Sequence, residues 1–218
     1  MFVIPENLAP ETYPMAWLVG TWRGYGVLGY PGIDDAAVIC DLEISSDEQL
    51  PYLTVRSRWT IANEHPDEID KELPGAPGVA QLSPDRVWAE ATGYLRQSSE
   101  KEGDLEAMMA TPDGRVSLYI GQINGPRMQL VSDAMIRCAT GAEVSAAAIQ
   151  VGLVESDMLF AYDMAAFGES MRSYCAGRLS RVQDEASESA SQAAPEAEDV
   201  ADADAREKAG EAQAKDED

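Results

Sequence analysis

The chain has 218 residues and a formal net charge of −23, from 16 basic and 39 acidic side chains. A body this acidic lacks the basic patches that nucleic acids and anionic membranes require, so we expect neither as a partner. The first residues do not resemble a signal sequence, and no apolar run reaches the roughly 20 residues that span a bilayer. The three cysteines are odd in number, which favours reduced thiols over disulfides. We therefore expect a cytoplasmic protein.

In chain order, residues 14–20 are predicted to form a short helical lid with Ala16, Trp17 and Leu18 facing inward. A G-x-W-x-G-x-G run then opens the first predicted strand. Its members are Gly20, Trp22, Gly24 and Gly26. Glycines let a strand bend and let neighbouring strands approach closely, while the indole is predicted to plug the closed end of a small barrel.

Nine further strands are predicted from short apolar runs bounded by turn residues. They span 37–44, 52–61, 86–95, 105–110, 116–123, 127–135, 143–154, 158–166 and 171–181. Asn124-Gly125 gives the strongest hairpin signal. Because most connections are short reversals, the sequence predicts an all-β fold: a single antiparallel up-and-down β-barrel of about ten strands, similar to lipocalins.

The connection 62–85 is much longer than a hairpin loop and is rich in Pro, Gly and acids. We expect it at one mouth of the barrel, either gating the cavity or serving as a mobile insertion without function. It carries His65, the only histidine, predicted to be solvated. A two-histidine metal site and a Ser-His or Cys-His pair on rigid strands are thereby excluded, so we predict no metal site and no catalytic residue.

Residues 183–218 carry 13 acidic and 3 basic side chains, and Val200 is their one large aliphatic residue. Such a segment buries too little apolar surface to offset its ordering entropy. We predict a disordered acidic tail after a barrel domain at 1–182.

The G-x-W-x-G-x-G run, with Tyr30-Pro31-Gly32-Ile33 directly after it, resembles the opening of the nitrobindin family, heme-binding barrels shaped like fatty-acid-binding proteins. Residues 92–96, 122–125 and 163–168 resemble later parts of the same family in the same order, and the resemblance covers about 14–181. It implies a ten-stranded barrel that holds heme b through a histidine on the last strand. It also implies ferric-heme chemistry: reversible binding of nitric oxide and isomerisation of peroxynitrite to nitrate.

Three positions depart from what the resemblance implies at the heme. Tyr174 stands where the ligand histidine falls, Gly32 where a heme-contacting threonine falls, and Trp88 in the region of a distal Met-His pair. These three are the candidate cofactor-binding residues. Strand alternation would place Arg172 and Arg178 on the face of Tyr174 and point Cys175 away from the cavity.

Two functions follow from these departures. The first is a nitrobindin-like barrel that has lost the iron-ligating histidine and its catalysis, has no cofactor, and binds a small apolar ligand. The alternative is a ferric-heme protein with Tyr174 as axial ligand, because tyrosinate can hold heme iron, acting on nitric oxide or peroxynitrite. The oligomeric state stays open, with a homodimer as one alternative.

Overall fold

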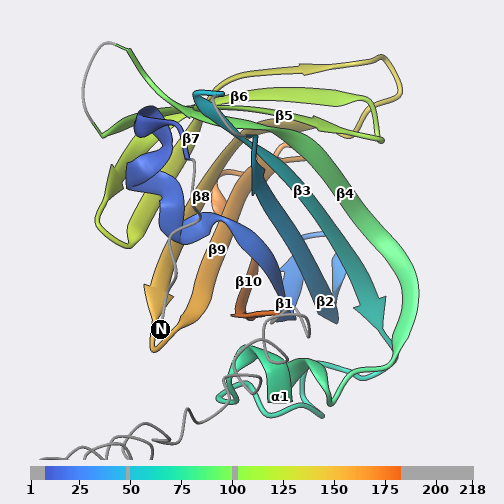
Figure 1. The fold of residues 1–218 in the computed structure, drawn as a ribbon. Coiled ribbons are helices and arrows are strands. Elements are labelled where there is room, and N and C mark those ends of the chain that lie inside the picture. Colours follow the sequence, from blue (N-terminus) through green and yellow to red (C-terminus); the bar gives the residue numbers. More distant parts are fainter. Residues whose placement is uncertain (1–7, 48–49, 100–102, 183–218) are drawn as a thin grey trace, which may run out of the picture. The chain divides into compact units, whose positions relative to one another are not determined.

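The computed structural model describes residues 8–47, 50–99 and 103–182. Ten strands close into one antiparallel barrel (Figure 1), in which each strand pairs with its neighbours along the chain and β1 closes against β10. The strands are β1 Gly20–Tyr30, β2 Ile33–Ser46, β3 Tyr52–Ala62, β4 Pro84–Gln97, β5 Asp104–Thr111, β6 Arg115–Asn124, β7 Arg127–Arg137, β8 Val144–Val154, β9 Asp157–Ala166 and β10 Arg172–Arg181. The predicted all-β, up-and-down barrel is confirmed.

The predicted hairpin between β6 and β7 is present, but its turn lies one residue later than expected. Asn124 pairs with Arg127, so Gly125 and Pro126 form the two-residue turn, with Gly125 at φ 54°. A positive φ at the first turn residue favours glycine. The β6–β7 register is therefore set by Gly125.

The glycines of the first motif allow β10 to approach β1. A Cβ at Gly24 would collide with the Arg178 carbonyl oxygen, and one at Gly26 would lie 2.8 Å from the Ala176 carbonyl oxygen. Trp22, two residues before Gly24, is 1% exposed, and its Nε1 donates to the Leu18 carbonyl at 2.8 Å. The predicted burial of the indole is confirmed, and the ring lies in the interior core of the barrel beside the lid.

The predicted lid is a 3-10 helix, η1 (Pro10–Leu18), which begins earlier than expected and ends before Gly20. Ala16, Trp17 and Leu18 are all buried, as the sequence predicted. Arg181 donates to the carbonyls of Val19 and Trp17. The closing strand therefore holds the lid at its C-terminal end.

The 62–85 connection packs on the outer surface of the barrel, and none of its residues lines the cavity described below. Its Ile69 and Leu82 form a second small core with Tyr25 on β1 and Ile39 on β2. The segment also contains α1 (Gly75–Val79), which contacts β1 and β10 (Figure 1). Of the two alternatives for this connection, gating of the cavity is wrong, because its apolar side chains cover an outward-facing apolar patch and none of its residues lines the cavity.

The predicted acidic tail at 183–218 lies outside the described residues. In the part of the chain that is described, no helix combines the length and apolar character needed to cross a bilayer.

Candidate functional site

The barrel encloses a cavity of about 370 Å³, toward the lower end of the range typical of small-molecule sites. Strands β2 to β10 and the end of η1 contribute side chains to it, most of them apolar. Its polar lining groups are Asp41, Ser57, Glu90, Thr111, Asp113, Arg115, Ser117, Tyr119, Tyr162 and Tyr174.

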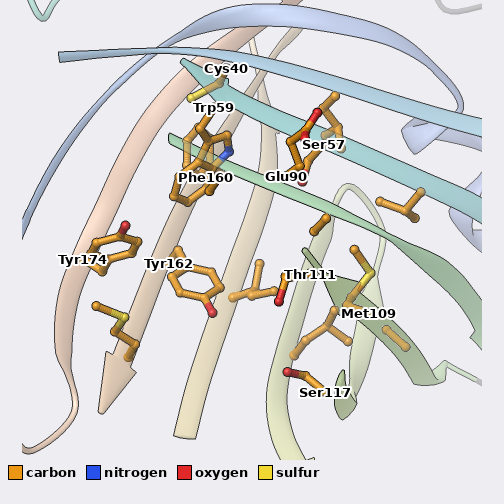
Figure 2. Close-up of a pocket in the computed structure, with 18 of the residues that line it drawn as sticks. Cys40, Ser57, Trp59, Glu90, Met109, Thr111, Ser117, Phe160, Tyr162 and Tyr174 are labelled. Atoms are coloured by element: carbon orange, nitrogen blue, oxygen red, sulfur yellow. The ribbon is translucent and has the colours of Figure 1, made fainter. Parts of the chain in front are cut away.

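One wall of the cavity is aromatic. Trp59 on β3, Phe160 and Tyr162 on β9 and Tyr174 on β10 lie together on one side of it (Figure 2). The Trp59 ring centroid lies 6.0 Å from those of Phe160, Tyr162 and Tyr174, and Tyr162 and Tyr174 are 5.9 Å apart. Pairs at these separations stabilise one another. All four rings stay partly accessible because they face the hollow.

Tyr174 enters this wall through a bulge in β10. The β10–β9 register shifts between Ser173 and Cys175, so strand alternation fails there. Tyr174 lines the cavity while Cys175 is buried in the same interior core. The prediction that Cys175 points away is therefore wrong. Arg178 does not assist Tyr174 either, because its Nε bonds Asp157 at 2.6 Å.

Trp88 reaches Tyr174 from the other side of the barrel. Its Nε1 donates a hydrogen bond of 2.6 Å to the Tyr174 hydroxyl oxygen. Burial raises the pKa of Tyr174 above its ordinary value, and the bond from Trp88 offsets only part of that increase. Tyr174 is therefore a neutral phenol at physiological pH.

Gly32 is not part of the cavity wall. It lies exposed in the β1–β2 turn at φ 81°, and its neighbour Ile33 contributes to the lining instead. The structure thus brings together Tyr174 and Trp88 of the predicted site but leaves Gly32 outside it. Trp59, Phe160 and Tyr162 were not predicted as site residues. Alternation along 158–166, with Phe160 and Tyr162 on one face, was the signal that could have identified two of them.

Two other potential iron donors in the cavity, Tyr162 and Cys40, are also held in their neutral forms. Burial raises the pKa of the Tyr162 phenol, with the adjacent Tyr119 adding to the effect. Burial likewise raises the pKa of the Cys40 thiol well above its usual value, as does the neighbouring Cys175. Neither group is prepared to act as an anionic ligand.

These residues do not fit a heme iron. The one histidine, His65, has a side chain 57% exposed on the outer connection, so no imidazole faces the cavity. The Tyr174 oxygen accepts a bond from Trp88, and the rings of Tyr30, Trp59 and Tyr162 pack around its own ring. A flat macrocycle would have to displace that packing before iron could reach the phenol oxygen.

Comparison with known proteins places this geometry in a family. Residues 11–181 match the THAP4-like, heme-binding beta-barrel domain. The chain belongs to this family. The predicted resemblance to nitrobindins is thereby confirmed over nearly the range expected from the sequence.

The match to this chain covers almost the whole length of individual relatives. The "Ferric nitrobindin-like protein" of Beutenbergia cavernae is 36% identical over 214 residues, covering 83% of this chain and 99% of the relative. The "Peroxynitrite isomerase" of Kocuria rhizophila is 31% identical over 198 residues, covering 83% and 95%. The crystal structure of Rv2717c from M. tuberculosis superposes with a TM-score of 0.65 at 21% identity, covering 81% and 99%, which shows the shared fold.

Proposed function

We propose that this member of the family is a non-catalytic binding protein for a small apolar ligand, and that it has lost the histidine that ligates iron in nitrobindins. The hydrogen bond between Trp88 and Tyr174 carries the proposal, because it occupies the phenol that stands in place of the imidazole. The mainly apolar lining of the cavity supports a ligand held by burial of its surface.

A hemin titration followed by absorption tests the loss of iron ligation. We expect no sharp Soret band with one-to-one stoichiometry for the wild type, and no isomerisation of peroxynitrite. Tyr174→Phe serves as the matched variant, since it removes only the hydroxyl. If the wild type gives a stoichiometric band that Tyr174→Phe abolishes, Tyr174 is an axial ligand and the proposal is wrong.

Binding of a neutral apolar dye tests the second half of the proposal. Nile red fluoresces when it leaves water, so we expect saturable fluorescence at one site per chain. Filling the cavity by Ala91→Phe should weaken this binding at least tenfold, because Ala91 is part of the lining. Unaltered binding in that variant would place the dye outside the cavity.

A further inference from the structure

The chemistry of the lining defines the class of ligand more narrowly than apolarity alone, and this inference rests on the proposed function. In the part of the chain that the structure describes, the charged residues that line the cavity are Asp41, Glu90, Asp113 and Arg115. The acids among them are paired: Asp41 with Arg23, Glu90 with Arg58 and Asp113 with Arg115.

Among the described residues, Arg115 is the one cation that lines the cavity, and it is paired with Asp113. Its Nε donates to the Asp113 carboxylate at 2.7 Å, and its side chain is 19% exposed. A ligand carboxylate entering the hollow would lose its hydration without gaining an unpaired cation, which disfavours its binding. The cavity is therefore built for an uncharged molecule.

The aromatic wall favours a flat molecule over a flexible chain. Trp59 lies at 34° to Phe160 and at 33° to Tyr174, so these three rings are tilted modestly. The fourth ring of the wall, Tyr162, stands edge-on to Trp59 at 89°. Met109 faces this wall from the opposite side of the cavity (Figure 2), and a thioether adapts to ring faces and edges. A rigid aromatic ligand between them loses little rotational freedom and gains ring–ring contact.

Several neutral hydroxyls that line the hollow are still able to form hydrogen bonds. The Tyr174 oxygen accepts from Trp88, which leaves its own hydrogen without an acceptor among the described residues. The hydroxyls of Ser57 and Ser117 also face the cavity, and neither has a hydrogen-bond partner among the residues that the structure describes. A hydroxyl or carbonyl group on the ligand can satisfy them.

We propose that the cavity binds neutral, planar aromatic compounds of two or three rings that carry a hydroxyl or carbonyl group, and that it rejects carboxylates of the same size. Isothermal titration calorimetry with three probes separates these properties. The probes are 2-naphthol, 2-naphthoate and decan-1-ol. We expect 2-naphthol to bind at least tenfold more tightly than either of the other two.

A variant that leaves Arg115 without its anionic partner tests whether the cavity selects neutral ligands. Asp113→Asn removes the anionic partner of Arg115 and leaves the guanidinium free to pair with a ligand carboxylate. The affinity ratio of 2-naphthoate to 2-naphthol should rise at least tenfold. Asp85→Asn is the matched control: it frees Arg86 at the protein surface, outside the lining, and should leave the ratio unchanged.

The outcomes distinguish a wrong ligand class from a failure of the proposed binding function. Equal affinity of the wild type for 2-naphthoate and 2-naphthol would overturn the claim that the ligand is neutral. Equal affinity for decan-1-ol and 2-naphthol would overturn the claim that the ligand is planar. The proposed binding function would stand in both cases. If no probe binds and Nile red does not bind either, the proposed function itself fails, and the ligand class with it.

Discussion

At position 174 the chain carries a phenol whose oxygen accepts a hydrogen bond from Trp88 Nε1, 2.6 Å away. Burial raises the pKa of this phenol, so it keeps its proton where an iron ligand would have to release it. An imidazole in the same place would have a lone pair available at neutral pH. A phenol at this position therefore differs from an imidazole in that it must lose a proton before it can ligate iron.

We expect Tyr174→His, combined with Trp88→Met to open the space above it, to raise the affinity for hemin at least tenfold. The imidazole can ligate iron without first losing a proton, and methionine is smaller and more adaptable than tryptophan. A Soret titration measures the change, with Trp88→Met alone as the control. If the double variant binds hemin no better than this control, the cavity does not admit the macrocycle.

Trp22 is a fully buried side chain of the interior core beside the lid. It is 1% exposed, and the Arg181 guanidinium lies 4.1 Å from its ring centroid. Trp22→Ala should lower the free energy of unfolding by about 3–5 kcal/mol, as removal of a buried aromatic does. Urea denaturation measures this, and Tyr13→Ala, at a side chain 58% exposed, should have little effect. A loss below about 1 kcal/mol for Trp22→Ala would contradict the buried-plug assignment.

At the scale of elements, local sequence predicted the strands well because alternation and turn residues act between neighbours. The prediction failed where long-range packing, or an extra residue in a strand, determines which way a side chain points. The bulge between Ser173 and Cys175 leaves no mark in hydrophobicity, yet it reverses which side chains face inward. The outer packing of Ile69 on Tyr25 joins residues far apart in the chain. For the same reason Trp59 could not be linked to Tyr174 from sequence alone.

Asp157, at the start of β9, holds the α1 segment to the barrel. Its carboxylate accepts bonds from the Gly75 amide at 3.0 Å, Arg178 Nε at 2.6 Å and the Ser180 hydroxyl at 2.7 Å. Burial acts to raise the pKa of Asp157, but these bonds together outweigh it and bring the pKa below its ordinary value. The carboxylate therefore stabilises the fold above the pKa of an unfolded aspartate, about 3.9, and this contribution is lost as the pH falls through the lower folded value.

Asp157→Asn should accordingly lower the free energy of unfolding by about 3 kcal/mol at pH 7, because it leaves Arg178 without its principal partner. The difference from the wild type should shrink as the pH falls below about 4. Urea denaturation at a series of pH values measures both effects. Glu106→Gln, which removes the exposed pair with Arg96, should cost at most about 1 kcal/mol at pH 7. A difference between wild type and Asp157→Asn that stays constant down to pH 2 would show that the charge is not what Asp157 contributes.

At the scale of the whole chain, the acidic charge divides unevenly. Residues 183–218 carry a net −10 of the total −23, which leaves −13 for the barrel region 1–182. Charge of one sign keeps a protein soluble but repels itself within a compact body. The composition of 183–218 predicts that this segment builds no core, so charge placed there is expected to give solubility with little repulsion inside the barrel. The composition of 183–218 thus predicts a role outside the stability of the barrel.

Truncation after Val182 should therefore leave the thermal unfolding midpoint within about 2 °C of the full chain at 0.15 M salt, since a solvated segment has few contacts to lose. Thermal denaturation of the two forms measures this, and hydrogen exchange should find the amides of 183–218 unprotected in the full chain. A truncation that begins at Cys175 is the matched control: it removes most of β10, whose pairing closes the barrel against β1, and should abolish cooperative unfolding. A midpoint more than about 5 °C lower after the first truncation, or protected amides in 183–218, would show that this segment packs on the fold and contributes to its stability.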